Sequence, residues 1–527
     1  MAETESNCSA HQCTRHDDDE SRTRAAMKDI WDGHCAAASR QDVMLDSKAL
    51  RTMKKSEKPE ILAMLPALKE MRVLELGAGI GRCTGYLAER AQHVTSVDFV
   101  EQFVEKNRQI NGVQHPNITF VCSDAMKLDY EENSFDIVFS NWLLMYISDA
   151  ELEELTKRIL RWVRVGGHVF FHECCFRQSG DFPGGASNLP TKYRDPKQYH
   201  HVFETTCYES SASSGAFRYE LDFSRSVGPY LQVNNNLYQM CWSWSKVLVE
   251  KKAQSNGDSY DSQSMRRFLD QEEYSVNAIQ CYEKMFGKNY VSTGGLETTA
   301  EFVPMLHLQR GEKVLDVGSG LGGCSLYMAE NYGVDVVGLD LSTNMVHIAL
   351  ARAVNCSAGS VLYEVSDITK RQFPDESFDV IYSRDTLQYV PGKAEVIKKF
   401  FRWLKPGGRI LISELCYGEG EWSDSFKTHV EQRHLATHSV KQYEQILCDA
   451  GFADVVADDR SRRFCERETK RASVERSELV KEFGEKDYED LVTKWKANIE
   501  WINAGEQCWG VFFGRKLLAK TGLVNGS

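Results

Sequence analysis

Residues 314–340 have the sequence VLDVGSGLGGCSLYMAENYGVDVVGLD, which predicts a strand, a glycine-rich turn, a helix and a second strand. The first strand is largely apolar, as a strand covered on both faces must be. Glycines at 318, 320, 322 and 323 allow a sharp turn and the close approach of a ligand to the backbone. Asp340 ends the second strand, where a carboxylate can accept both hydroxyl groups of a ribose. The stretch predicts a site for a cofactor with an adenosine end.

The same unit occurs twice in the chain. VLELGAGIGRCTGYLAE at 73–89 corresponds to 314–330, and Asp98 corresponds to Asp340. Two later landmarks recur in the same order: FDIVFSN at 135–141 with FDVIYSR at 378–384, and WVRVGGHVFF at 162–171 with WLKPGGRILI at 403–412. Landmarks that keep their order over a whole unit indicate a duplicated domain rather than a chance motif.

Composition limits the classes of function. The chain has 527 residues, with 63 basic and 76 acidic side chains, so it lacks the basic excess typical of a nucleic-acid-binding protein. No apolar run approaches the ~20 residues of a membrane span, and the N-terminus is polar and acidic. We expect a cytoplasmic protein without a nucleic-acid or membrane partner. The 16 cysteines have no paired framework and are interpreted as reduced thiols.

The motif order resembles class I S-adenosylmethionine-dependent methyltransferases, and several segments resemble the two-domain, plant-like phosphoethanolamine N-methyltransferases. The segments are MRVLELGAGIGR, SNWLLMYIS, STGGLETT, IYSRDT, WLKPGG and a C-terminal EQxWG. The resemblance extends from about residue 30 to residue 515. It implies an α/β fold with two tandem Rossmann-like domains, each a mostly parallel seven-stranded sheet flanked by helices.

The resemblance also implies a reaction. S-adenosyl-L-methionine would methylate the nitrogen of phosphoethanolamine, through mono- and dimethyl intermediates, to phosphocholine, a phospholipid precursor. The cofactor product would be S-adenosyl-L-homocysteine, no metal would be needed, and the protein would be a monomer whose partner is a small phosphobase.

Domain boundaries follow from composition. Residues 1–24 have too few apolar side chains to fold and are expected to be a disordered tail, and Cys8, His11, Cys13 and His16 within it are not favoured as a zinc site. Residues 25–250 are expected to form the first methyltransferase domain and 266–527 the second. Residues 251–265 are the expected linker, because 251–263 has low hydrophobicity and loop-forming residues. Residues 200–250 are expected to cover the first site.

Cofactor contacts carry over from the resemblance in both halves. In the first half they are Gly77, Arg82, Asp98, Asp124, Ala125 and Asn141. In the second half they are Val291, Ser292, Gly318, Asp340, Asp367, Ile368 and Arg384. Physically, an arginine at a helix N-terminus suits the methionine carboxylate, although Arg82 could also be a solvated first-turn charge.

Substrate contacts implied by the resemblance are Ser179, Gly180, Tyr193, Tyr274 and Arg433. The candidate catalytic residues are Tyr274, Asp385 and Tyr389. Asp385 is the only carboxylate in RDTLQYV at 384–390 and is well placed to hold a cationic amine or take its proton. Trp142 and Tyr146 follow the fourth strand of the first domain and are candidates to face the amine. Arg194 is a candidate phosphate partner on charge alone.

Two local patterns have alternative readings. Tyr274 and Tyr282 lie in a segment, 268–287, that is predicted to be helical, and eight-residue spacing is also typical of core packing. HECC at 172–175 suggests a metal site, but the repeat has SELC at 413–416, so a metal is not favoured.

The second acceptor pocket departs from the family pattern. Tyr389 stands where the family typically has histidine, and Leu415, His429 and Leu435 stand where tyrosines are expected. Gly505 replaces an expected lysine. The second half could therefore methylate another small amine or be non-catalytic. A nicotinamide dehydrogenase would explain the glycines and acids, but not the SNWLLMY and SRDT segments.

Overall fold

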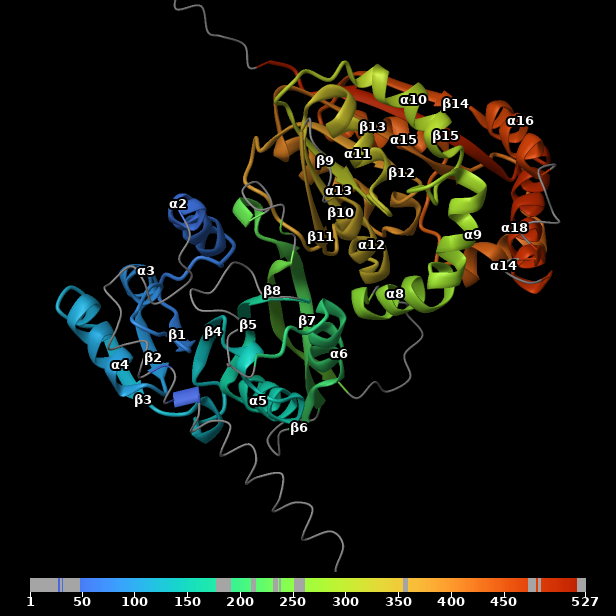
Figure 1. Cartoon of the computed structure of the whole chain (residues 1–527). Coiled ribbons are helices and arrows are strands. Elements are labelled where there is room, and N and C mark those ends of the chain that lie inside the picture. The colour runs from blue at the N-terminus through green and yellow to red at the C-terminus, as the bar shows by residue number, and fades with distance from the viewer. Residues whose placement is uncertain are drawn as a thin grey trace, which may run out of the picture. The chain divides into compact units, whose positions relative to one another are not determined.

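The computed structural model describes residues 27–28, 31, 48–176, 191–209, 215–230, 236, 238–250, 261–353, 359–472, 480–481 and 485–518. The chain divides into two compact units, Met1–Asn256 and Gly257–Ser527. The expected tail at 1–24 lies outside the described residues. Each unit is described below by itself (Figure 1).

The N-terminal unit contains a mostly parallel sheet with the strand order β7-β8-β5-β4-β1-β2-β3. Neighbouring strands from β5 to β3 run parallel, whereas β8 is antiparallel to both β5 and β7. A short strand, β6, pairs with β7. The strands are β1 (Arg72–Leu76), β2 (His93–Asp98), β3 (Ile118–Cys122), β4 (Phe135–Asn141), β5 (Val163–Cys174), β6 (Cys207–Glu209), β7 (Gly215–Ser226) and β8 (Gln239–Glu250).

The C-terminal unit repeats this order as β14-β15-β13-β12-β9-β10-β11, with β15 antiparallel to β13 and β14. The predicted α/β fold, with a mostly parallel seven-stranded sheet in each domain, is confirmed. The strands are β9 (Lys313–Val317), β10 (Asp335–Asp340), β11 (Ser360–Val365), β12 (Phe378–Arg384), β13 (Leu404–Tyr417), β14 (Ala453–Asp459) and β15 (Gln507–Arg515).

Helices flank each sheet. In the N-terminal unit they are α2 (Lys48–Ala63), α3 (Thr84–Arg90), α4 (Glu101–Asn107), η1 (Arg108–Gly112), η2 (Ala125–Lys127), η3 (Leu144–Tyr146), α5 (Asp149–Trp162) and α6 (Pro196–Thr205). In the C-terminal unit they are α8 (Ser262–Phe268), η4 (Leu269–Glu273), α9 (Val276–Phe286), α10 (Gly295–Phe302), η5 (Val303–Leu306), α11 (Gly323–Tyr332), α12 (Thr343–Ala353), η6 (Leu387–Tyr389), α13 (Lys393–Trp403), α14 (Asp424–Gln432), α15 (Val440–Asp449), α16 (Ser461–Ala472) and α18 (Glu485–Asn503).

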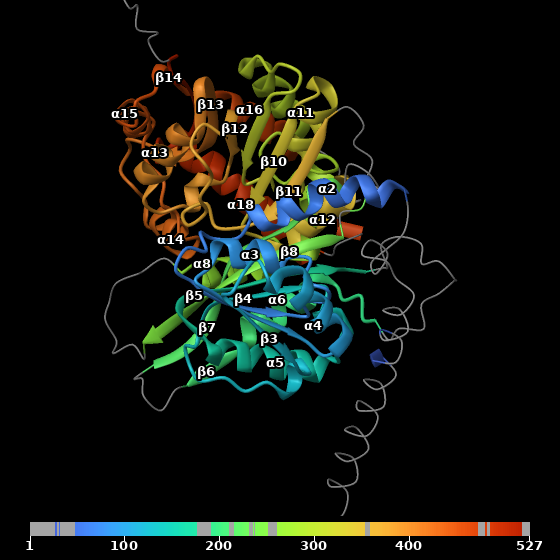
Figure 2. The same cartoon turned by 90° about the vertical axis from the view of Figure 1, so that its left-hand side faces the viewer.

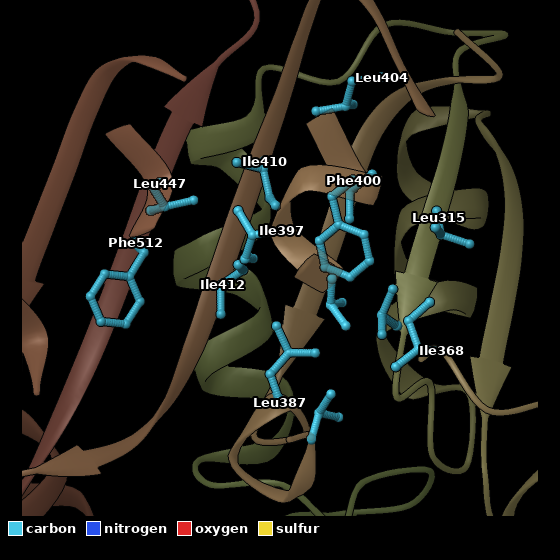
Figure 3. Packing of buried hydrophobic residues seen from close by; sticks show 14 of the residues in the cluster. Leu315, Ile368, Leu387, Ile397, Phe400, Leu404, Ile410, Ile412, Leu447 and Phe512 are labelled. Atoms are coloured by element: carbon cyan, nitrogen blue, oxygen red, sulfur yellow. The ribbon is translucent and has the colours of Figure 1, made fainter. Parts of the chain in front are cut away.

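The core of the C-terminal unit lies between its sheet and the pair α13 and α15, which lie together on one side of the sheet (Figure 2). Phe400 and Ile397 of α13 pack against Ile410 of β13, and all three are fully buried (Figure 3). On the opposite face, Trp509 of β15 packs against Phe302 of α10, with ring centroids 5.5 Å apart. Apolar side chains therefore cover both faces of the sheet, and polar groups that bind a ligand are confined to the strand ends.

Three expectations about local structure were wrong. Residues 215–226 and 239–250 are sheet strands, β7 and β8, that pair antiparallel with each other, and not a cover over the first site. The side chains of β7 largely alternate between buried and half-buried. The segment 268–287 is not one helix, because Ser275 caps a new helix, α9, with its hydroxyl group 3.3 Å from the amide of Ala278. The linker ends earlier than residue 265, since α8 begins at Ser262, whose hydroxyl group bonds to Asp367.

No helix in the described part of the chain is long and apolar enough to cross a membrane.

Phe400→Ala should destabilise the C-terminal unit by about 3–5 kcal/mol, because it empties a fully buried position between α13 and the sheet. Hydrogen exchange read by mass spectrometry reports peptides of each unit separately. The control Val456→Ala removes two methyl groups from a side chain that is 53% exposed and should change stability by less than about 0.5 kcal/mol. Equal loss of protection in both variants would contradict this assignment of the core.

Candidate active sites

A cavity of about 760 Å³ lies at the carboxyl ends of β1, β2 and β4 in the N-terminal unit. Open α/β sheets bind ligands at this edge. The turn after β1 forms one wall, and its glycines Gly77, Gly79 and Gly81 have φ angles of 69°, 57° and 83°. These left-handed conformations explain why glycine occupies the three positions.

Asp98 is fixed by the backbone around this turn. Its two carboxylate oxygens accept hydrogen bonds from the amides of Gly79, at 2.8 Å, and Val100, at 3.0 Å. The side chain lies in the cavity wall, and burial raises its pKa above the usual value. A carboxylate held in this way keeps lone pairs for a ligand, as the ribose prediction requires.

Asp340 repeats this arrangement in a second cavity, of about 190 Å³, in the C-terminal unit. Its oxygens accept from the amides of Gly320, at 2.9 Å, and Ser342, at 2.8 Å. Burial raises the pKa of Asp340 to about 6. The hydrogen bonds from the two amides act to lower this pKa, and the nearby carboxylate of Asp270 acts to raise it.

The shape of both turns fits a nucleoside cofactor. A side chain added at Gly79 would meet no atom within 4 Å, and one added at Gly320 would meet only Val291, at 3.6 Å. Both glycines line the cavities, so the space next to their backbone is available to a ligand. Gly318 lines the C-terminal cavity, but its added side chain would collide with Thr386 at 1.8 Å.

The next strand ends carry the second predicted acid of each unit. Asp124 accepts from the amide of Met126 at 2.9 Å, and Asp367 accepts from that of Thr369 at 2.8 Å. Each hydrogen bond closes a turn that leaves the following residue, Ala125 or Ile368, in the cavity wall. The structure therefore brings the predicted cofactor residues of each unit to one cavity.

The sequence analysis missed a buried acid in the first strand of each unit. Glu75 accepts from the hydroxyl of Thr84 at 2.6 Å, and Asp316 accepts from that of Ser325 at 2.5 Å. Burial raises the pKa of each to about 7. Both acids line the cavities. The sequence contains a pattern that could have revealed both acids, because each is an acidic residue at the same position of an otherwise apolar strand.

Arg82 faces the N-terminal cavity and forms an ion pair with Glu57 of α2. Glu57 also accepts from the hydroxyl group of Tyr230 at 2.7 Å. The helix before the first strand thus reaches the cavity through this ion pair, and Arg82 is not a freely solvated charge. Met27 and Trp31 from the preceding segment also line this cavity.

Asn141 and Arg384 occupy corresponding strand ends but make different contacts. The oxygen of Asn141 lies 2.7 Å from Nδ1 of His172, which fixes the amide at the cavity wall. Burial lowers the pKa of His172 to about 4, so this imidazole is neutral at pH 7. Arg384 donates to Thr299 Oγ1 at 2.8 Å and to the carbonyl of Thr293. It therefore holds the loop containing Val291 and Ser292 against the C-terminal cavity.

Aromatic side chains line part of the N-terminal cavity. The rings of Trp31 and Tyr146 meet edge to face at 5.8 Å, and Trp142 donates to the Gln239 side chain at 3.0 Å. Tyr193 packs against the neighbouring core cluster and is half-buried. The predicted contacts Ser179 and Gly180 lie outside the described residues.

The loop that carries these aromatics is held by a residue that the sequence analysis did not select. Glu173 accepts from three consecutive amides, those of Leu143 at 3.0 Å, Leu144 at 2.7 Å and Met145 at 3.3 Å. Burial raises its pKa to about 8, although the amides oppose this. Its counterpart, Glu414, forms a fully buried ion pair with Lys393 at 3.2 Å.

Arg194 also holds this loop. Its guanidinium donates to the carbonyls of Leu144 and Ile147, both at 2.6 Å, and to Asp149 at 2.8 Å. Only 3% of the side chain is exposed. The prediction that Arg194 meets a phosphate was therefore wrong, because charge alone did not reveal its internal partners.

In the C-terminal unit, η4 brings Tyr274 over the cavity. Asp270 of η4 accepts from the amides of Thr343 and Asn344 at the start of α12, each at 3.2 Å. Asn344 in turn donates to the carbonyl of Tyr274 at 3.2 Å. The Tyr274 and Tyr282 rings lie 6.1 Å apart, and both line the cavity with Tyr389 and Arg433.

Asp385 stands where the N-terminal unit has Trp142, and both residues have a left-handed backbone, with φ angles of 52° and 57°. One carboxylate oxygen of Asp385 accepts from the amide of Thr293 at 3.0 Å. The other oxygen is buried and has no hydrogen-bond partner within the described residues. Burial raises the pKa of Asp385, partly offset by Arg384. This arrangement can hold an ammonium group or accept its proton.

The described residues contain no group of three or more His, Cys, Asp or Glu side chains that could hold a metal ion. His172 and Glu173 of the HECC segment instead position Asn141 and the loop 143–145.

Glu173→Ala should raise the KM for the acceptor by at least about tenfold, with little change in cofactor affinity, because buried amides left unpaired cost ~1–3 kcal/mol each. Glu173→Gln should be much milder, since a carboxyl group with a pKa of about 8 already carries a proton at pH 7. Steady-state kinetics with cofactor calorimetry tests this difference. Equal KM values for the two variants would contradict it.

Comparisons with known proteins agree with this geometry. The family described as "Methyltransferase domain" matches residues 315–412, and a second family of the same description matches residues 73–167. Phosphoethanolamine N-methyltransferase of Triticum aestivum is 46% identical over 499 residues, covering 94% of this chain and 95% of the relative. Phosphoethanolamine N-methyltransferase 3 of Arabidopsis thaliana is 43% identical, covering 94% of this chain and 98% of that protein.

A solved structure shares the fold. Haemonchus contortus phosphoethanolamine N-methyltransferase 2, in complex with phosphomonomethylethanolamine and S-adenosylhomocysteine, superposes with a TM-score of 0.69. It is 22% identical, and the match covers 89% of this chain and 99% of the other. The duplicated methyltransferase domains and the extent of the sequence identity place this chain in the phosphoethanolamine N-methyltransferase family.

Proposed function

We propose that this protein methylates the nitrogen of phosphoethanolamine with S-adenosyl-L-methionine, through the mono- and dimethyl compounds, to phosphocholine. The observation that carries the proposal is the repeated cofactor site, in which a backbone-anchored acid lies beside a glycine turn in both units. Family membership supplies the substrate class. The proposed cofactor residues are those brought to the two cavities, namely Gly77, Arg82, Asp98, Asp124, Ala125, Asn141, Val291, Ser292, Gly318, Asp340, Asp367, Ile368 and Arg384.

The cofactor, when bound, supplies an electrophilic methyl group on a sulfonium centre. The protein then has to position the acceptor nitrogen in line with that methyl group and keep it unprotonated. In the N-terminal unit we assign positioning to Trp31, Trp142 and Tyr146, whose rings offer faces to a cationic amine. Burial raises the pKa of Tyr146 above its usual value, so its phenol stays protonated at neutral pH.

In the C-terminal unit, we assign proton transfer to Asp385, because its side chain lines the cavity, one of its oxygens is buried without a hydrogen-bond partner within the described residues, and burial favours its protonated form. Tyr274 and Tyr389 form the aromatic wall beside it. Burial raises the pKa of both phenols, so neither accepts a proton readily. They act in this proposal by positioning the amine.

We assign the first methylation to the N-terminal unit. Asp98→Ala in the full chain should strongly reduce methylation of phosphoethanolamine, whereas Asp340→Ala should retain formation of the monomethyl product. Each acid provides charged acceptors for ribose hydroxyls, worth about 1.5–3 kcal/mol per hydrogen bond. Product analysis by mass spectrometry checks the assignment. Undiminished turnover of phosphoethanolamine by the Asp98→Ala variant would overturn it.

Cofactor affinity of the C-terminal site should depend on pH. Only the ionised carboxylate of Asp340 can accept both ribose hydroxyls, and burial raises its pKa to about 6. In the Asp98→Ala background, affinity for S-adenosylmethionine should therefore be constant above pH 7 and fall by up to about tenfold per pH unit below 6.

Asp340→Asn in the same background is the control for this pH dependence. It should bind more weakly above pH 7 and lose the fall in affinity between pH 7 and pH 5. Calorimetry, with circular dichroism to verify folding at each pH, makes the comparison. Unchanged affinity of the Asp340 protein down to pH 4.5 would refute the role of this carboxylate.

A further inference from the structure

Arg433, the one arginine among the predicted substrate contacts and thus the residue suited to a phosphate, already has an acidic partner within the chain. Arg433 forms an ion pair with Glu273 and donates to the hydroxyl oxygen of Tyr389 at 2.7 Å. Glu273 also accepts from the hydroxyl group of Tyr282 at 3.2 Å. The Glu273 side chain is 5% exposed and that of Arg433 is 18% exposed, so solvent screens this pair only weakly.

Glu273 cannot leave this position easily. It is the last residue of η4, and η4 is fixed to the start of α12 by Asp270, which accepts from the hydroxyl group of Ser342 and the amide of Asn344. The amide nitrogen of the Asn344 side chain donates to the carbonyl of Asp270 at 2.9 Å. The backbone of Glu273 is therefore held against the start of α12, which keeps its side chain within reach of Arg433.

A phosphate that reached Arg433 would displace this carboxylate or lie beside it. Either outcome leaves a buried carboxylate next to a dianion, and breaking a buried ion pair in this way is strongly unfavourable. The described residues that line the cavity offer little further positive charge, because Arg433 and Arg384 are their only arginine or lysine side chains, and Arg384 is hydrogen-bonded to Thr299 and Thr293. Leu415 and Leu435 add hydrocarbon to the wall, and His429 and Asn498 add polar groups. The arginine that could meet a phosphate is thus already neutralised within the chain.

Other residues of the same cavity suit an amine. Asp385 lines the cavity and has one buried oxygen without a hydrogen-bond partner within the described residues. The rings of Tyr274, Tyr282 and Tyr389 also line the cavity. A carboxylate with aromatic faces is a favourable environment for an ammonium group.

We propose that Glu273 determines the acceptor specificity of the C-terminal unit: it closes Arg433 to phosphate, and the unit methylates a small amine whose other end carries no anion. This inference rests on the proposed function, because it takes methyl transfer to an amine nitrogen as the reaction. In that transfer, the nitrogen lone pair forms the new bond to the methyl carbon, the sulfonium carbon–sulfur bond breaks, and the nitrogen proton passes to Asp385. Phosphobase methylation then belongs to the N-terminal unit.

The test uses the full-length Asp98→Ala variant, in which turnover depends on the C-terminal site. Ethanolamine and phosphoethanolamine are a matched pair of acceptors that differ only in the phosphate. Transfer of a labelled methyl group from S-adenosylmethionine should give a kcat/KM for ethanolamine that exceeds the value for phosphoethanolamine by at least about tenfold. Preference for phosphoethanolamine, or no transfer to either amine, would overturn the proposal.

Glu273→Gln in the Asp98→Ala background tests the effect of the negative charge of Glu273 alone. It should raise kcat/KM for phosphoethanolamine by at least about tenfold, chiefly through KM, because Arg433 is released without a change in side-chain size. Affinity for S-adenosylmethionine should be unchanged, which shows that the variant folds. Unaltered kcat/KM for phosphoethanolamine in a variant that still binds the cofactor would refute the role of Glu273.

Glu312→Gln is the matched control. Glu312 also pairs with a partly buried arginine, Arg409, at 2.7 Å, but it lies immediately before β9 and does not line the cavity. It should not improve phosphoethanolamine as an acceptor, and an equal improvement would count against a specific effect of Glu273. The Asp340→Ala variant distinguishes failure of the proposed function from failure of this inference. Loss of phosphoethanolamine methylation in that variant would count against the proposed function, independently of which amine the C-terminal unit accepts.

Discussion

In each unit, a hydrogen bond between a glycine amide and the acid of the next strand joins the two strand ends that form the cofactor site. The bonds run from Gly79 to Asp98 and from Gly320 to Asp340. The bond requires a left-handed turn, which only glycine adopts without strain, and it orients a carboxylate whose burial is otherwise costly. Cavity, acid and turn therefore depend on one another, which explains why the two repeats agree most closely in this region.

The two units differ outside the region that this hydrogen bond fixes. At the end of the fourth parallel strand, Trp142 and Asp385 adopt the same left-handed backbone but present an indole and a carboxylate. The backbone geometry is retained because the preceding strands are paired in the same way, whereas the side chain is free to change the acceptor chemistry. The C-terminal ion pair of Glu273 and Arg433 lies on this variable side.

The fold, and the gathering of the predicted cofactor residues at one cavity in each unit, could be predicted from the sequence because they depend on local signals that occur twice: apolar strands, a glycine turn and an acid at a fixed distance. Glu75 and Asp316 carried a similar signal that was overlooked. Arg194 could not be interpreted from charge, since its partners are carbonyl groups of a loop some 50 residues away in sequence. The break before Ser275 depends on a capping hydroxyl group, and a polar residue in a helical pattern does not by itself reveal a new helix start.

The acceptor specificity of the second unit could be predicted only as a departure from the family pattern. Sequence comparison singled out Tyr389, Leu415 and Leu435, but the partner of Arg433 emerged only when η4 was seen to lie over the cavity. Glu273 is distant in sequence from Arg433 and carries no local signal. Long-range pairing of this kind is where the structure adds most to the sequence.

The most direct test of the account is the binding stoichiometry of the full chain, measured by calorimetry with S-adenosylhomocysteine and then with phosphoethanolamine on the cofactor-saturated protein. The account predicts two molecules of S-adenosylhomocysteine and one of phosphoethanolamine per chain. A single molecule of S-adenosylhomocysteine, or two of phosphoethanolamine, would contradict it.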